Sequence, residues 1–318
     1  MLAFRERWVR FWFEPVDPLN LGLCRILFFG AFFLYYLRYD TSVWGGVPYS
    51  LWVPISFFKT LHLPLLSSSL LTMIQSIWKV SLALSCIGIL TRVSTLSSFV
   101  LGLYLLGVSQ NFGKVYHSVG LVVIIMGIMA VSRCGDAVSI DHVIRSVHRG
   151  SNPLVQRPRA SGEYTWPVRA VWVTFALVFF AAGISKLRHS GLEWVFSDNL
   201  AILLTRAHYL QDEVLSWGVD LARYDWLTRL LAAATIVLET SYPLALFSRR
   251  ARWVIVPSVF FMQIGIMLLM GVSFKTFLIS NLFWVPWDRV VREFVRGFHK
   301  LSSLLAHSTS GTKDHPRQ

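Results

Sequence analysis

Residues 93–113 read VSTLSSFVLGLYLLGVSQNFG, a stretch of 21 residues without a charged side chain. It lies between Arg92 and Lys114, and 18 further uncharged residues, VYHSVGLVVIIMGIMAVS, separate Lys114 from Arg133. A helix needs about 20 predominantly apolar residues to cross the hydrocarbon core of a bilayer. The two stretches therefore predict two consecutive membrane-spanning helices joined by a short turn at Lys114.

The composition of the whole chain agrees with this local pattern. Of the 318 residues, 54% are hydrophobic and only 15% are charged, whereas about 25% of the residues in an ordinary soluble domain are charged. The charged residues cluster between long apolar stretches, which excludes a soluble globular enzyme, a disordered chain and a disulfide scaffold. We therefore expect an all-α, polytopic integral membrane bundle, with the lipid bilayer as a partner.

The apolar stretches predict about eight transmembrane helices. The last one has only 14 residues, fewer than a bilayer requires, so it is expected to be re-entrant or partly buried. The predicted spans cover residues 21–37, 70–90, 93–113, 115–132, 168–186, 227–247, 253–271 and 274–287.

The chain divides into three parts around these spans. Residues 1–20 are expected to form an amphipathic cytoplasmic segment, and residues 21–287 the transmembrane domain. Residues 288–318 begin with Arg289, Arg292 and Arg296 at helical spacing, beside Val290 and Phe294. This pattern predicts a basic amphipathic helix on the inner leaflet, followed by a disordered tail.

The positions of the basic residues indicate the orientation of the chain. With eight crossings and a cytoplasmic N-terminus, 19 Lys and Arg residues fall in cytoplasmic segments, 8 lie outside and 3 lie within spans. Cytoplasmic loops of membrane proteins are enriched in Lys and Arg, so we expect both termini on the cytoplasmic face of the cell membrane. No basic run is long enough to indicate nucleic-acid binding, despite the net charge of +13.

Two ionisable residues, Arg25 and Glu239, lie inside predicted spans at similar depths. A charge within the membrane is costly unless it is paired, and such residues often mark functional sites. We expect an intramembrane ion pair between Arg25 and Glu239 that fixes helix packing. Direct participation of Glu239 in proton transfer is the alternative.

A candidate site lies at the predicted outer ends of spans four and five. Lys186 follows the small residues around Gly183, which allow another helix or a flat ligand to approach closely. Desolvation there makes the neutral amine, a usable base, more available. His117 opens span four on the same side, near Tyr116 and Trp194. Together they indicate an outward-opening site, while a snorkelling lysine and a helix-capping histidine are the plain alternatives.

Several short motifs resemble the horizontally transferred transmembrane (HTTM) family, which includes the vitamin K-dependent gamma-carboxylases. The resemblance covers about residues 16–287 and implies the membrane part of that family without its lumenal C-terminal domain. The similar stretches are VDP (16–18), CRILF (24–28), IGILTRVS (87–94), YHS (116–118), SID (139–141), AGISKL (182–187), EWV (193–195) and the segment 271–286.

The resemblance implies a function for the candidate site. In the carboxylases, the lysine that Lys186 matches is held to deprotonate vitamin K hydroquinone, and the histidine that His117 matches is also an active-site residue. Lys186 and His117 are therefore the expected catalytic residues, with Tyr116, Gly183 and Trp194 as expected contacts of a reduced quinone. The family chemistry couples oxygenation of this quinone to removal of a glutamate γ-proton and addition of CO2.

Two functions remain open from the sequence. Tyr116 and Ser185 stand where the carboxylase pattern has an asparagine and a lysine, and other short members of the family serve the maturation of a secreted toxin peptide. The chain is thus either a quinone-linked enzyme or a non-catalytic membrane factor for the maturation or export of a secreted peptide or protein. The sequence contains no metal-ligand spacing and no inverted repeat of broken spans typical of transporters.

Overall fold

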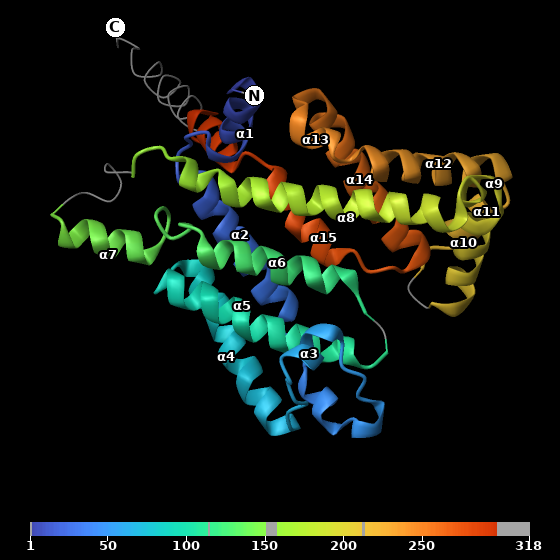
Figure 1. The fold of residues 1–318 in the computed structure, drawn as a ribbon, viewed down its shortest axis with the longest axis horizontal. Helices are drawn as coiled ribbons and strands as arrows, with labels where there is room; N and C mark the ends of the chain where they lie inside the picture. Colours follow the sequence, from blue (N-terminus) through green and yellow to red (C-terminus); the bar gives the residue numbers. More distant parts are fainter. Residues whose placement is uncertain (1, 114, 151–157, 212–213, 298–318) are drawn as a thin grey trace, which may run out of the picture.

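The computed structural model describes residues 2–113, 115–150, 158–211 and 214–297. Within these residues the chain is helical and has no strand beyond an isolated antiparallel bridge between Val16 and Ser161, so the all-α prediction is confirmed. Long helices run along the molecule, and the short helix α15 lies among them (Figure 1). The helices are α1 (Leu2–Phe13), α2 (Leu19–Tyr36), η1 (Ser42–Gly46), η2 (Tyr49–Leu51), α3 (Ser56–Thr60), α4 (Ser68–Ile87), α5 (Thr91–Val108), η3 (Ser109–Asn111), α6 (His117–Val131), α7 (Ile140–His148), η4 (Gly162–Tyr164), α8 (Trp166–Ser190), α9 (Glu193–Phe196), α10 (Asn199–Leu210), α11 (Trp217–Ala222), α12 (Asp225–Ser241), α13 (Leu244–Phe247), α14 (Arg249–Met270), α15 (Lys275–Ser280) and η5 (Asn281–Trp284), and residues 287–297 are also helical.

Five helical segments are long and apolar enough to cross a membrane, which indicates an integral membrane protein. They correspond to the first, second, third, fifth and seventh predicted spans. Their bounds are Leu19–Tyr36, Ser68–Ile87, Thr91–Asn111, Gly162–Ser190 and Arg249–Met270.

The other three predicted spans are shorter or broken. In the fourth, α6 has 15 residues, about 22 Å at 1.5 Å per residue, against about 30 Å of hydrocarbon. The sixth is divided into α12 and α13 at Tyr242 and Pro243, because proline supplies no amide hydrogen to continue a helix. In the eighth, only the six residues of α15 are α-helical before η5 begins.

The loops lie at two ends of the molecule. At one end, which we call the basic end, Trp287 N donates to Asn20 Oδ1 over 2.9 Å and the Phe11 and Phe247 rings lie 6.3 Å apart. At the other, which we call the α9–α11 end, Leu215 N donates to Leu268 O over 3.0 Å. Helix α8 runs between the ends, with α7 beyond the first and α9 to α11 at the second (Figure 1).

The segment after α14 returns through the interior to the basic end. It leaves the α9–α11 end near Leu268 and reaches Asn20 at Trp287. Ser280 and Phe283 on the way are fully buried. Irregular backbone is tolerated at membrane depth where protein surrounds it, so a short α15 continued by η5 is stable here.

Helix starts follow the local sequence. Asp17 Oδ1 accepts a hydrogen bond from Leu19 N over 2.8 Å, at the start of α2. Ser248 Oγ accepts from Ala251 N at the start of α14. Each bond satisfies one of the amide hydrogens that the first turn of a helix leaves unpaired.

Candidate functional site

Lys186 and Glu239 form an ion pair between α8 and α12. Lys186 Nζ lies 2.8 Å from Glu239 Oε1 and 2.6 Å from Oε2. The helices run antiparallel, since Phe179, which precedes Lys186, and Tyr242, which follows Glu239, also have their ring centroids 4.7 Å apart. The Glu239 side chain is 7% exposed and that of Lys186 is 20% exposed. The pair is therefore largely removed from solvent, with the remaining access on the lysine side.

Trp194 lies against this pair from α9. The centroid of its ring is 5.5 Å from Lys186 Nζ, within the range of a cation–π contact. Residues between Ser190 and Glu193 turn the chain at Gly191, which has a φ of +57°, so that α9 folds back toward the end of α8. The structure thus brings Trp194 to Lys186, as the sequence suggested, and adds Glu239 to them.

The space beside Gly183 is filled by α12. A Cβ at Gly183 would lie 2.8 Å from Thr240 Cγ2 and 3.0 Å from the Thr240 nitrogen. Of the two partners that a small residue admits, a helix or a flat ligand, the structure contains the helix. A cofactor contact at Gly183 stays a prediction, and α12 occupies the space beside its Cα.

Tyr116 and His117 precede and open α6. Tyr116 N donates to Gln110 Oε1 over 2.6 Å, and the Tyr116 side chain is half exposed. His117 is the first residue of the helix, and its side chain lies outside the described part of the structure. Assistance of Lys186 by His117 and a ligand contact by Tyr116 stay predictions.

The predicted ion pair between Arg25 and Glu239 is wrong. The Arg25 side chain is fully buried and donates to four backbone carbonyls instead. Its partners are the oxygens of Ser85 at 2.6 Å, Cys86 at 2.9 Å, Val138 at 2.6 Å and Cys134 at 3.1 Å. Since Glu239 is bound to Lys186 and Arg25 to main chain, each charge has its own neighbours.

Two structural features explain why Arg25 binds main-chain oxygens, although its predicted depth in the membrane is similar to that of Glu239. Ser85 and Cys86 belong to the last turn of α4, whose carbonyls have no partner within the helix and carry the negative end of its dipole. Residues 134–138 fold back over this turn and supply the other two acceptors. An arginine presents five donors in a planar fork and so can bind both segments at once.

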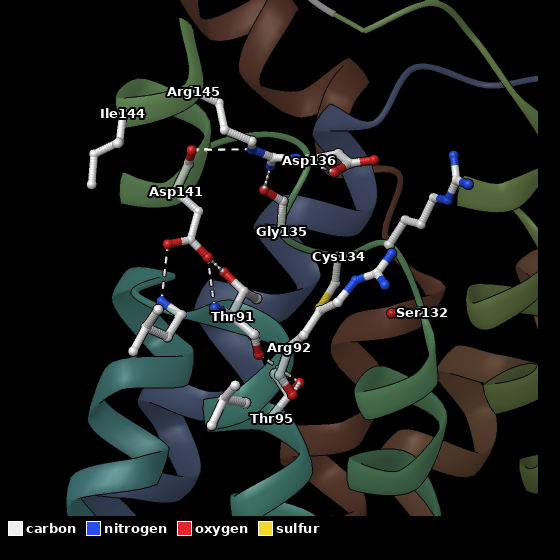
Figure 2. A pocket seen from close by; sticks show the side chains of 13 residues that line it. Thr91, Arg92, Thr95, Ser132, Cys134, Gly135, Asp136, Asp141, Ile144 and Arg145 are labelled. Carbon is white, nitrogen blue, oxygen red and sulfur yellow. Dashed lines mark hydrogen bonds and ion pairs between the residues drawn. The ribbon is translucent and has the colours of Figure 1, made fainter. Parts of the chain in front are cut away.

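Asp141 completes this arrangement at the start of α5 (Figure 2). Its carboxylate accepts hydrogen bonds from Leu90 N at 2.9 Å, Thr91 N at 2.6 Å and Thr91 Oγ1 at 2.7 Å. Burial raises the pKa of Asp141, but these three bonds and the charge of Arg145 outweigh it and lower the pKa below its usual value. We call Arg25, Gly88, Thr91, Ser139 and Asp141 the Arg25–Asp141 cluster.

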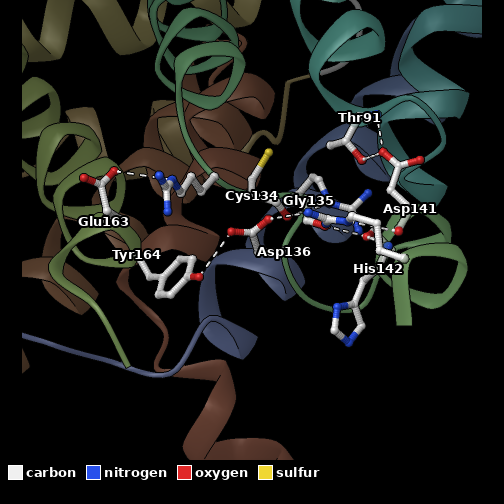
Figure 3. A network of polar contacts seen from close by, with 12 residues as sticks. Thr91, Cys134, Gly135, Asp136, Asp141, His142, Glu163 and Tyr164 are labelled. Atoms are coloured by element: carbon white, nitrogen blue, oxygen red, sulfur yellow. Dashed lines mark hydrogen bonds and ion pairs between the residues drawn. The ribbon is translucent and has the colours of Figure 1, made fainter. Parts of the chain in front are cut away.

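A surface network extends from this cluster toward the start of α8 (Figure 3). Arg145 Nη1 donates to Asp136 Oδ1 over 3.2 Å, and Tyr164 Oη donates to Asp136 Oδ2 over 3.2 Å. Arg133 lies 4.0 Å from Glu163. These contacts hold the 133–139 loop against η4.

The Arg25–Asp141 cluster was not predicted, although its sequence signal was visible. Three of the motifs that suggested a family, residues 24–28, 87–94 and 139–141, meet in it. Asp141 N donates to Gly88 O over 3.0 Å, and a Cβ at Gly88 would lie 2.4 Å from Ser139 Cβ. These motifs therefore lie at contacts between helix ends, and neither Lys186 nor Glu239 belongs to any of the three.

Two cavities open at the basic end. One, of about 510 Å³, lies beside the Arg25–Asp141 cluster between α5 and α7 (Figure 2). The other, of about 890 Å³, lies between α8, α14 and the 278–290 segment. Neither is lined by Lys186 or Glu239, so the ion pair and the cavities are separate features.

Comparison of the chain with known proteins finds no relative. No protein-family model, curated protein or solved structure matches it.

Proposed function

We propose that this chain is an eight-crossing membrane protein in which Lys186 and Glu239 exchange a proton with a weakly acidic, lipid-soluble substrate of the reduced quinone class. One observation carries the proposal: an ion pair lies within an apolar helical bundle, and its lysine keeps some access. Ionisable groups at such positions are rare and commonly mark proton or substrate pathways.

Helix packing alone does not account for the pair. Helices α8 and α12 already meet closely where Gly183 faces Thr240, and small residues suffice for such contacts in a membrane. A buried ion pair contributes little net stability, because desolvation offsets the attraction. Lys186 and Glu239 are therefore better explained by a role in chemistry.

The geometry gives Lys186 and Glu239 different roles in this proton exchange. Lys186 Nζ lies within 2.8 Å of both carboxylate oxygens, so in the charge-separated form of the pair the ammonium donates to both. The Glu239 carboxylate then accepts the proton of a weakly acidic hydroxyl, and the ammonium stabilises the negative charge left on that oxygen. Trp194 covers the lysine and limits the entry of water.

The eight-crossing topology is part of the proposal. The return of residues 271–287 to the basic end supplies an eighth crossing despite its short helices, and the excess of basic residues favours cytoplasmic termini. Reporter fusions after Gly150 and after Ser216 test this. We expect a cytoplasmic signal from the first and an external signal from the second, and the reverse pattern would overturn the topology.

The membrane module proposed here resembles that of the HTTM family, and glutamate carboxylation is the most specific reaction the resemblance offers. A second function is favoured by the filled space beside Gly183, which removes one surface for a flat ring. In it, the chain is a non-catalytic membrane factor for the maturation or export of a secreted peptide.

Quinone content separates these functions. We would purify the full chain and the variants Lys186→Met, Glu239→Gln and Lys79→Met from membranes, then quantify extracted quinones by mass spectrometry. Lys79 is the matched control, because its Nζ donates to Leu37 O and Tyr39 O at 3.0 Å and contacts no carboxylate among the described residues. We expect bound quinone in the wild type and Lys79→Met, and at least about a tenfold loss in the other two. Equal quinone in all four, or none in the wild type, would favour the membrane factor.

A further inference from the structure

The larger cavity at the basic end contains a group of arginines against tryptophan rings. The guanidinium carbons of Arg169 and Arg252 each lie 4.2 Å from the centroid of the Trp172 ring. Trp172 is itself stacked on Trp284 at 4.5 Å with an interplanar angle of 10°. The two guanidinium groups therefore lie against the same indole ring in the wall of the cavity. Such an arrangement is stable when an anion lies between them.

Four arginines and three carboxylates, those of Glu14, Asp17 and Asp288, line this cavity. Arg169 lies 3.9 Å from Glu14, whose side chain is 55% exposed. In the part of the chain that the structure describes, Arg249, Arg252 and Arg289 form no ion pair with a carboxylate.

The remaining acids of the cavity have other partners. Asp288 is paired with Arg292, and Asp17 accepts a hydrogen bond from Leu19 at the start of α2. Arg252 donates to two main-chain oxygens, Ala245 at 2.9 Å and Leu246 at 3.2 Å, which fix the direction of its guanidinium. The cavity therefore has an excess of positive charge in a fixed place.

The other half of the lining is apolar. It is formed by side chains of α14 and of the returning segment, namely Val256, Pro257, Phe260, Leu278, Ile279 and Leu282. These helices belong to the membrane-spanning part of the chain. A soluble anion such as inorganic phosphate would leave this surface unused, whereas an acyl chain would cover it.

We propose that this cavity binds an anionic phospholipid, with the phosphate of the headgroup between Arg169 and Arg252 and an acyl chain along α14. Arg249 and Arg289, which also line the cavity, add to the positive potential at its mouth. Basic pockets between transmembrane helices bind lipid phosphates in this way, and arginine is suited to phosphate because its planar fork forms two parallel hydrogen bonds. The site is separate from Lys186 and does not rest on the proposed function.

The test uses the full chain, delipidated in neutral detergent and titrated with phosphatidylglycerol, phosphatidylcholine or glycerol 1-phosphate. Native mass spectrometry counts bound lipid and tryptophan fluorescence records the melting temperature. The variants are Arg169→Gln, the double variant Arg249→Gln/Arg289→Gln and, as matched control, Arg250→Gln. Arg250 is exposed on the same helix turn and lines neither cavity. The double variant retains every main-chain contact of Arg252. A loss of lipid binding in this variant therefore does not result from misfolding around Arg252.

We expect one tightly held phosphatidylglycerol that raises the melting temperature, and at least about a tenfold weaker affinity for phosphatidylcholine. Arg169→Gln and the double variant should each weaken phosphatidylglycerol binding about threefold to tenfold, with Arg250→Gln unchanged. Equal binding of both lipids, equal losses in Arg250→Gln, or stabilisation by glycerol 1-phosphate as large as that by the lipid would each overturn the proposal.

Discussion

Arg25 and Lys186 are both charged residues within the helical bundle, and their surroundings differ in kind. Arg25 is fully buried and donates to four backbone carbonyls from two segments. Lys186 is 20% exposed and is bound to a single carboxylate that is itself ionisable. The partners in the first arrangement are carbonyls, which do not ionise, whereas the second joins two ionisable side chains.

This difference distinguishes Arg25, which is bound to main chain, from the pair for which we propose a role in chemistry. Carbonyls cannot take up a proton, so the contacts of Arg25 are permanent and join α2, α4 and the 133–139 loop. The Lys186–Glu239 pair consists of two side chains that each have a protonated and a deprotonated form. A charge inside a membrane protein is therefore best judged by the chemical type of its partners, since burial is common to both sites.

The largest effect is expected at Arg25. Arg25→Lys replaces five fixed donors by three on a single nitrogen, which cannot reach both the α4 end and residues 134–138. Leaving buried carbonyls unpaired costs about 1–3 kcal/mol each, so we expect a loss of about 3 kcal/mol or more. Size-exclusion profiles and melting curves of detergent-solubilised protein measure it. Arg92→Lys, at an exposed position of the same end, is the control, and equal profiles for the two variants would contradict a structural role.

Gly88→Ala should lower the stability of the folded protein nearly as much as Arg25→Lys. Gly88 has a φ of +75°, and an added Cβ would lie 2.6 Å from Arg25 Nη1 and 2.4 Å from Ser139 Cβ. The left-handed backbone costs about 1–2 kcal/mol for alanine, and overpacking about 1–3 kcal/mol more. The melting temperature of Gly88→Ala should therefore lie below that of the wild type. In Gly120→Ala, where a Cβ would meet nothing within 4 Å, it should be unchanged or slightly higher, and a similar fall in both variants would show that the Gly88 contacts are unimportant.

Double-mutant cycles sharpen the comparison further. Lys186→Met and Glu239→Gln should be coupled by about 0.5–3 kcal/mol, because each removes the partner of the other. Glu239→Gln and Arg25→Lys should add within about 0.5 kcal/mol, since the two residues share no contact. Chemical denaturation of each single and double variant measures the free energies of unfolding from which the coupling is calculated. Coupling in the second cycle and additivity in the first would restore the pairing that the sequence suggested.

The smallest effect is a pH dependence at Asp141. Hydrogen bonds from Leu90 and Thr91 lower the pKa of Asp141 in the folded state, so its contribution to stability is complete above the unfolded-state value of about 3.9 and is lost as the pH falls through the folded-state value. The melting temperature of Asp141→Asn should therefore lie below that of the wild type near pH 6 and approach it near pH 3. Asp220→Asn, at an exposed position of α11, should show no such convergence, and a constant gap for Asp141→Asn would contradict the assignment.

The membrane class and the positions of the long helices could be predicted from the sequence, because uninterrupted apolar stretches are a one-dimensional signal. Trp194 was placed near Lys186 because α9 follows α8 after a short turn.

The partners of the buried charges could not be predicted in this way. Arg25 binds carbonyls 60 to 113 residues away in the chain, and any residue type can supply a carbonyl, so the sequence carries no mark of them. Glu239 and Arg25 have similar depths in their helices, but depth does not say which helices are neighbours. The packing of α8 on α12 decides that Glu239 binds Lys186.

Infrared difference spectroscopy on addition of a reduced quinone tests the central claim most directly. If the Lys186–Glu239 pair takes up a proton, the carbonyl stretch of a protonated carboxylic acid should appear in the wild type and in Lys79→Met, and should be absent from Glu239→Gln. Absence of this band from the wild type, or its persistence in Glu239→Gln, would contradict proton exchange at Glu239 and leave the pair as a packing contact.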